Sequence, residues 1–302
     1  MTTPEPPRKA FLNIGFHTGG FNSAYISFEK AVRWAEEHGV HGIECGFVGG
    51  VTWNHGLGYF PHVASWEDPQ EIRRMLDRHG VALSQIDAAF PLSGSNGPRI
   101  AVPYILEAIR WAAHAGCPMV DTTDGLHKPS DLTEEEAMGQ MRGSYARILE
   151  TAERCGIVVT VETHGYFTAD PDRMAEMLAF ADSPFLQMTM DTGNVFIAGQ
   201  DPVQFLSRFL NRVGHVHLKD VAPRLSETAR GKETGIGMSH CSLGEGVNAQ
   251  NIRGCLELLR DHGFRGAVSL ECEAQGGPVM ERSLRWVREV LKDLNLAHDL
   301  DF

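Results

Sequence analysis

Residues 152–162 read AERCGIVVTVE, a helical pattern that ends on Gly156 and passes directly into a β-branched, apolar run. A glycine at this point suits the left-handed residue that closes many helices. The same junction recurs in AEEHGVHGIEC, LDRHGVALSQID, AAHAGCPMVDT and RDHGFRGAVSLE, with glycines at positions 39, 80, 116 and 263. Five such junctions predict a repeated helix-to-strand unit.

Less clearly marked segments extend this repeat to eight strands and eight helices. The predicted strands lie near 11–16, 40–45, 81–87, 117–122, 157–162, 186–191, 213–218 and 266–271. The predicted helices are 27–38, 69–79, 99–115, 133–155, 171–181, 201–210, 249–262 and 278–293. This alternation is typical of a single (β/α)8 TIM barrel in the α/β class. A doubly wound open sheet with a small appended domain is the main alternative.

The predicted strands and helices divide the chain into three parts. We expect a flexible N-terminal arm at 1–10, a barrel catalytic domain at 11–293 and a C-terminal tail at 294–302. The unequal loops after the second and seventh strands are the expected walls of the functional site, because βα loops build the sites of such barrels.

Composition narrows the class of protein. The 302 residues are 42% hydrophobic and 22% charged, with a net charge of -12 and no cluster of basic residues, so nucleic acid is not an expected partner. No apolar run approaches the ~20 residues that span a bilayer, and the polar N-terminus does not resemble a signal peptide. The six cysteines form no C-x-x-C pair and indicate reduced thiols. A cytoplasmic protein without a membrane partner is expected.

Four residues of the kinds that bind divalent cations stand at the ends of the last four predicted barrel strands. They are Glu162, Asp191, His217 and Glu271. Strand C-termini meet at one mouth of a parallel barrel, so these side chains are expected to converge. An oxygen-rich set with one imidazole suits Mn²⁺, with Mg²⁺ or Co²⁺ as alternatives. In the other interpretation, each acid only caps a helix or pairs with a basic residue.

Five segments together carry a family resemblance. They are VETH (161–164), MDTGN (190–194), HVHLKD (215–220), LGEGVN (243–248) and GFRGAVSLECE (263–273). As a set they resemble the sugar phosphate isomerase/epimerase superfamily of xylose-isomerase-like barrels, over about residues 10 to 293. That superfamily includes ketose 3-epimerases, hydroxypyruvate isomerases, inosose and 3-dehydroshikimate dehydratases, and the large subunits of C-glycoside deglycosidases.

The resemblance implies roles for the four strand-end residues. The metal quartet of the family falls on the same four positions, and in the epimerases its two glutamates also form the acid/base pair. Glu162 and Glu271 are therefore the implied catalytic carboxylates. Glu273, two residues further along the same strand face, is a competitor for the last ligand position.

Two differences from the epimerase sequence pattern argue against simple epimerase activity. Epimerases commonly carry a His where this chain has Asn194, and an Arg where it has Pro223, with Arg224 displaced by one. The segment ETHGYF and the long loop at 234–248 look more like the C-glycoside deglycosidases, which implies elimination-type cleavage of a 3-oxo-glycoside by a lyase. Epimerase and dehydratase chemistry remain alternatives, together with a non-catalytic barrel and an endonuclease of the apurinic-site type.

His164 shares a strand face with Glu162, two residues earlier, and is a candidate general base. It could instead only hold that glutamate in place. The candidate substrate-binding residues are His17, Trp53, Asp87, Asn194, Lys219, Asp220 and Arg224. The expected partner is a small carbohydrate. We also expect a homo-oligomer, and the deglycosidase resemblance implies a small second subunit.

Overall fold

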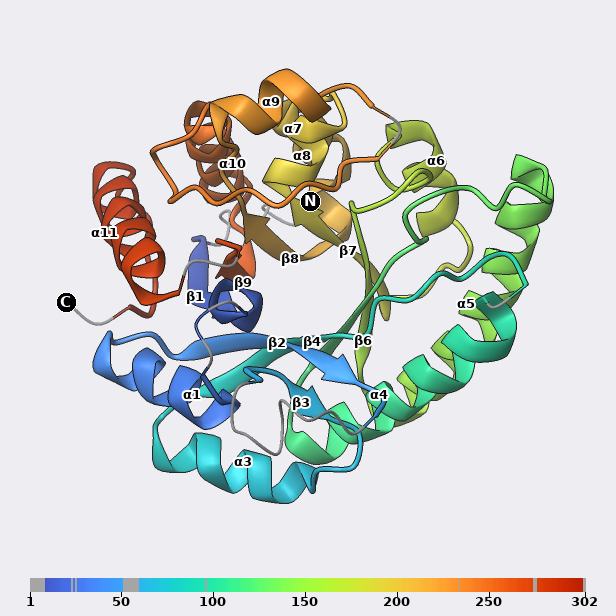
Figure 1. The fold of residues 1–302 in the computed structure, drawn as a ribbon, viewed down its shortest axis with the longest axis horizontal. Coiled ribbons are helices and arrows are strands. Elements are labelled where there is room, and N and C mark those ends of the chain that lie inside the picture. The colour runs from blue at the N-terminus through green and yellow to red at the C-terminus, as the bar shows by residue number, and fades with distance from the viewer. Residues whose placement is uncertain are drawn as a thin grey trace, which may run out of the picture.

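The computed structural model describes residues 9–22, 24, 26–50, 60–95, 97–232, 234–273 and 276–300. Its strands form a closed, all-parallel barrel surrounded by helices (Figure 1). Around the ring stand β1 (Phe11–His17), β2 (Gly42–Val48), β4 (Ala82–Asp87), β5 (Met119–Thr122), β6 (Val158–Glu162), β7 (Leu186–Asp191), β8 (Val213–Leu218) and β9 (Arg265–Leu270). The pairing of β1 with both β2 and β9 closes the ring, and the short β3 (Val63–Ala64) pairs in parallel with the end of β2. The predicted single barrel is confirmed, and the open-sheet alternative is wrong.

Eight helices follow the predicted pattern along the chain. They are α1 (Phe28–Glu37), α3 (Pro69–Arg78), α4 (Val102–Ala115), α5 (Glu134–Cys155), α6 (Pro171–Leu178), α8 (Pro202–Phe209), α10 (Ala249–His262) and α11 (Gly277–Asp293). The structure adds α7 (Thr192–Ile197) and α9 (Pro223–Ala229), which were not predicted. It also contains short helical turns at η1 (Thr18–Phe21), η2 (Gly97–Ala101) and η3 (Leu210–Arg212).

Local sequence explains where the helices begin and end. The five junction glycines all have positive φ, from 62° at Gly39 to 79° at Gly116, as the left-handed ending requires. At the start of α5, Thr133 and Glu136 exchange hydrogen bonds in a capping box. These signals act within a few residues, so they are readable from sequence.

Two irregularities in strand register set which side chains enter the barrel. Ser84 is skipped where β4 pairs with β2, so that Gln85 lies opposite Glu44. Gly214 is skipped where β8 pairs with β7, so that His215 lies opposite Thr189. A bulge of this kind re-aims the side chains that follow it. Polar side chains from four strands thereby face one another inside the barrel.

The chain's final described residues pack onto the barrel. Leu12 N donates to Ala297 O at 2.9 Å, and Ile14 N donates to Asp299 Oδ1 at 2.7 Å. Leu300 is buried. The segment predicted as a tail is thus ordered against β1 as far as residue 300. Of the predicted flexible arm, residues 1–8 lie outside the described residues. No helix in the described part of the chain has the length and apolar character needed to cross a membrane.

Candidate metal centre

Four side chains converge at the C-terminal mouth of the barrel. Glu162 and Asp191 end β6 and β7, His217 is the penultimate residue of β8, and Glu271 directly follows β9. One ligand atom from each lies within 4.8 Å of the others. These four residues are called the ligand group below. Their use as metal ligands stays a prediction, but the structure brings the four together.

Two buried oxygen atoms of the ligand group show that its donor set fits a cation. Among the described residues, Asp191 Oδ2 has no hydrogen-bond partner, and Glu271 Oε2 lies 3.1 Å from Nδ1 of His217, which is itself a member of the ligand group. The second carboxylate oxygen of Asp191, Oδ1, accepts hydrogen bonds from the backbone N–H groups of Gly193 and Asn194 at 2.7 and 2.9 Å. Buried carboxylate oxygens without a partner are costly unless a cation compensates them. Oxygen donors with one imidazole suit a divalent ion.

The charges at this centre are strongly coupled. Burial raises the pKa of Asp191 well above its usual range, and the charges of Glu271 and Glu162 add to that effect. Burial alone would also raise the pKa of Glu271, but the charges of Lys219 and His217 outweigh it and hold that pKa well below the usual range. Burial would lower the pKa of His217, yet the surrounding carboxylates raise it well above normal. A divalent cation and a proton would therefore compete for this imidazole.

His164 lies at the edge of the ligand group. Its Nδ1 is 3.3 Å from Glu162 Oε2, and its side chain is 29% exposed, compared with 8% for that glutamate. Its backbone N–H donates to Thr168 Oγ1, which fixes the turn after β6. The imidazole therefore contacts Glu162 and is partly exposed at the barrel mouth. This geometry leaves both interpretations of His164 open, as a base or as a support for Glu162.

Lys219 places a buried ammonium group beside the ligand group. Its Nζ is 2.6 Å from Glu273 Oε1, 3.5 Å from Glu271 Oε1 and 3.9 Å from Asp191 Oδ2. Burial would lower its pKa, but these carboxylates raise it well above the usual range. Glu273 also accepts from the N–H of Ser239. Glu273 therefore pairs with the lysine and with the long loop, and it is not one of the four converging residues.

Three other candidates for substrate contact lie close to the ligand group. His17 ends β1, and its ring centroid is 6.3 Å from that of His217. Asn194 Nδ2 lies 3.5 Å from Glu162 Oε1. Asp87 ends β4. Burial raises the pKa of Asp87, although the charge of His17 acts to lower it. These three side chains line the mouth together with the ligand group.

The remaining candidates for substrate contact are Asp220, Arg224 and Trp53. The Asp220 carboxylate accepts four backbone N–H groups, from Val221, Gly244, Gly246 and Asn248. A role in holding the long loop accounts for this residue, because its lone pairs are already used. Arg224 is exposed on α9. Trp53 lies outside the described residues.

Sequence reasoning missed Glu44, which lies fully buried on β2. The next residue, Cys45, packs in the apolar core. Glu44 instead contacts His215 and His217. Burial would raise the pKa of Glu44, but the two histidines hold it well below its usual range. The available signal was an acidic residue inside an otherwise apolar strand, since such a residue is rarely buried without a partner.

Comparison with known proteins agrees with this architecture. The model of the xylose isomerase-like TIM barrel family matches residues 32–290. The chain therefore belongs to the xylose isomerase-like TIM barrel family. An inosose dehydratase from Clostridium beijerinckii is 24% identical over 146 residues, which cover 46% of this chain and 48% of that protein. The chain thus spans about half the length of this curated relative.

Solved structures share the whole barrel. A D-tagatose 3-epimerase-like protein matches with a TM-score of 0.75 at 20% identity, covering 94% of this chain and 98% of that one. The IolI protein, solved with a bound zinc atom, matches with a TM-score of 0.73 at 12% identity, covering 94% and 99%. At these identities the similarity establishes the fold alone.

Proposed function

We propose that this chain is a divalent-metal-dependent lyase acting on a sugar or cyclitol. It would remove a proton next to a carbonyl group and eliminate the substituent on the adjoining carbon. The observation that carries this proposal is the ligand group, whose four donor atoms lie within 4.8 Å of one another at the barrel mouth. Three carboxylates and one imidazole favour Mn²⁺, with Mg²⁺ or Co²⁺ as alternatives. The zinc atom in IolI supports a divalent cation on this fold.

The proposed chemistry divides between the cation and the protein. A bound divalent ion would polarise the substrate carbonyl and stabilise the negative charge that develops as the neighbouring C–H bond breaks. Glu162, Glu271 and His164 are the candidate bases for that proton. The C–H electron pair becomes the new C=C bond while the bond to the leaving group breaks. The leaving group takes up a proton, so the products are an unsaturated carbonyl compound and water or a free aglycone.

Elimination is preferred to epimerisation because of His164. Epimerisation needs one acid/base group on each face of the carbon, which two glutamates can supply. Elimination also needs a group that serves the leaving substituent, and the His164 imidazole lies 3.3 Å from Glu162, outside the ligand group. The inosose dehydratase relative supports water as the leaving group. The aglycone of a 3-oxo-glycoside is the alternative leaving group, supported by the resemblance to deglycosidases.

Epimerisation of a free ketose is the second candidate. Its support is the pair of glutamates within the ligand group and the similarity in fold to a D-tagatose 3-epimerase-like protein. Asn194, where the epimerases commonly carry a His, speaks against it.

A substrate panel followed by proton NMR in D₂O tests the proposal. Metal-stripped protein is loaded with Mn²⁺ and incubated with inososes, 3-oxo-glycosides and free ketoses. We expect deuterium exchange next to the carbonyl and formation of an unsaturated product in the first or second class, with both lost after chelation. An epimerised ketose without an eliminated product would replace elimination by epimerisation. Exchange that is indifferent to chelation would remove the metal from the proposal.

A further inference from the structure

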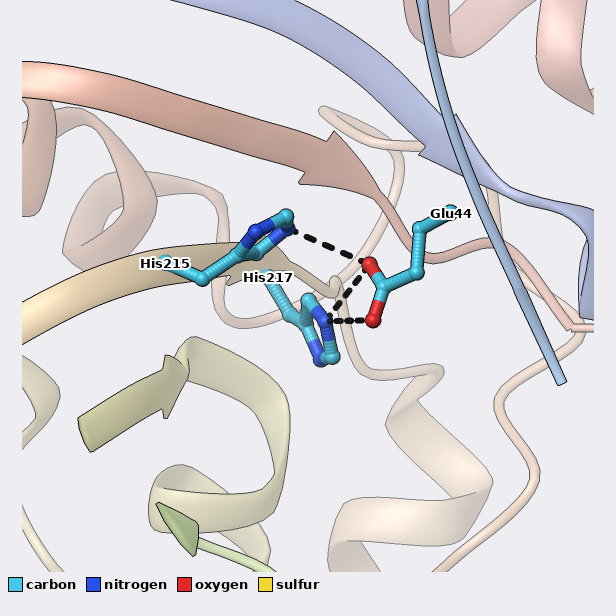
Figure 2. Close-up of side chains that lie close together, drawn as sticks. All are labelled: Glu44, His215 and His217. Carbon is cyan, nitrogen blue, oxygen red and sulfur yellow. Dashed lines mark hydrogen bonds and ion pairs between the residues drawn. The ribbon is translucent and has the colours of Figure 1, made fainter. Parts of the chain in front are cut away.

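A second group of polar side chains lies directly beneath the ligand group. His215 and His217 extend from β8 toward the carboxylate of Glu44, which reaches them from β2 (Figure 2). His217 Nε2 lies 3.0 and 2.9 Å from the two oxygens of Glu44. His215 Nε2 lies 3.2 Å from Glu44 Oε2. The three residues are at most 3% exposed.

The carboxylate of Glu44 is itself held in place. Gln85 Nε2 donates to Glu44 Oε1 at 2.9 Å, and Gln85 is fixed in turn by Thr160 and Thr189. His215 Nε2 also contacts Ser269 Oγ at 2.8 Å. An ionised carboxylate in a protein interior is tolerated only when several donors satisfy it. Glu44 meets this condition and has little freedom to move.

The two nitrogens of the His217 ring face different groups. Nδ1 points to the ligand group, 3.2 Å from Glu162 Oε1 and 3.1 Å from Glu271 Oε2. Nε2 points to Glu44. When a cation occupies the ligand group, Nε2 would carry the proton of the neutral ring, because the Glu44 carboxylate that it faces only accepts hydrogen bonds. The lone pair is then left on Nδ1, on the side where a cation would bind.

We propose that Glu44 is a positioning residue, which orients the His217 ring and fixes its tautomer so that Nδ1 is presented as a metal ligand. This inference rests on the proposed metal dependence of the site. Metal-bound histidines commonly donate their second N–H to a carboxylate, which fixes the ring and strengthens it as a ligand. Here that carboxylate comes from β2, on a different part of the barrel wall from β6, β7, β8 and β9, which supply or lead into the ligand group.

Glu44, His215 and His217 could also be considered as a second metal site, since their ligand atoms cluster within 4.8 Å. The contacts argue against it. A cation there would displace the hydrogen bonds from Gln85 and Ser269, and it would need Nε2 of His217 without its proton. We therefore expect one cation per chain, with the deeper group serving as its support.

The test compares two neutral isosteres in the same buried layer. Glu44→Gln removes the charge that faces His217. Asp121→Asn is the matched control, because Asp121 is equally buried but accepts hydrogen bonds from Thr160 and Thr189 rather than from His217. Calorimetric titration of metal-stripped protein with Mn²⁺ gives affinity and stoichiometry. The visible absorption of the Co²⁺ form reports the ligand geometry directly.

We expect Glu44→Gln to weaken Mn²⁺ binding about 10- to 100-fold and to shift the Co²⁺ spectrum. The control should stay within about 3-fold of the wild type, well below that range, and keep its spectrum. Equal affinity and spectrum in Glu44→Gln and wild type would overturn the inference while leaving the metal site intact. Two cations per wild-type chain would also overturn it. Failure of the wild type to bind any cation would instead overturn the proposed function and this inference with it.

Circular dichroism establishes whether each variant is folded. If Glu44→Gln does not fold, Glu44→Asp replaces it, because this change keeps the charge but draws the carboxylate back from the ring. The same weakening and spectral shift are expected. An unchanged affinity in the aspartate variant would count against the inference.

Discussion

Lys219 Nζ lies 2.6 Å from Glu273 Oε1, and this ion pair joins the end of β8 to the segment that follows β9. The lysine side chain is 3% exposed, and its Nζ is also 3.5 Å from Glu271. Lys219→Met should lower the free energy of unfolding by about 3 kcal/mol, because it leaves the partly buried carboxylates of Glu271 and Glu273 without their cation. Urea unfolding monitored by circular dichroism measures this change.

A double-mutant cycle separates the ion pair from simple loss of packing. Adding Glu273→Gln to Lys219→Met removes the carboxylate that would otherwise stay uncompensated. We expect the double variant to recover part of the stability lost by the lysine variant alone. Strictly additive losses would show that the two side chains do not interact across this contact.

The roles of Glu162 and His164 can be distinguished by separate readouts. Glu162→Gln should reduce both Mn²⁺ affinity and turnover, because the glutamate belongs to the ligand group. His164→Asn should reduce kcat by about 10²- to 10⁴-fold, as expected for loss of a general base, and leave Mn²⁺ affinity unchanged. Turnover is measured at saturating metal with the substrate found in the panel. Weaker metal binding in His164→Asn at full kcat would show that the imidazole only holds Glu162.

The barrel fold could be predicted from the sequence because the patterns that mark its helices and strands are local. A glycine such as Gly156 closes a helix, and the apolar run after it forms a strand, without reference to distant parts of the chain. The converging positions were also readable, since a residue at a strand end reaches the mouth whatever its neighbours are. Asp191 and Glu271 are of this kind.

Other features depend on contacts between distant segments and could not be predicted. Glu44 enters the interior opposite Gln85 through the bulge at Ser84, and its histidine partners lie more than 170 residues away. Asp220 was a candidate for substrate contact, but its use depends on how the loop up to Asn248 folds back. The acidic residue within an apolar strand indicated that Glu44 is buried, but the partners of Glu44 and of Asp220 have no local sequence signal.

Asp124 should make stability depend on pH. Burial raises its pKa to about 6, although the N–H groups of Phe167 and Thr168 and the charge of His164 act to lower it. A pKa above the unfolded value of 3.8 means that the native state binds the proton more tightly. The resulting stabilisation is present below pH 3.8 and is lost as the pH rises through 6. Over that interval the loss is on the order of 3 kcal/mol.

The difference in unfolding free energy between the wild type and Asp124→Asn isolates this effect from other titrations. We expect the variant to gain stability relative to the wild type between pH 4 and 7. Asp77→Asn, on the exposed face of α3, is the control. A difference between wild type and Asp124→Asn that does not change over this pH range would contradict the assignment. Urea unfolding at several pH values provides the measurement.

The long loop between β8 and α10 should depend on Asp220. Its Oδ1 accepts from the N–H groups of Val221 and Asn248 at 2.8 and 2.9 Å, and its Oδ2 accepts from those of Gly244 and Gly246 at 2.9 Å each. Asp220→Ala removes all four charged hydrogen bonds and should cost at least about 3 kcal/mol, because hydrogen bonds to a charged group contribute about 1.5–3 kcal/mol each.

Hydrogen–deuterium exchange locates the effect of that substitution. The backbone amides of Gly244, Gly246 and Asn248 should exchange faster in Asp220→Ala, whereas those of β6, on another part of the barrel wall, should lose protection only to the extent that global stability falls. Asp220→Asn keeps one acceptor oxygen and should give an intermediate result. Because Ser239 in the same loop donates to Glu273, loosening the loop should also weaken the pairing of Glu273 with Lys219. Unchanged exchange at residues 244–248 in the alanine variant would mean that other contacts hold the loop.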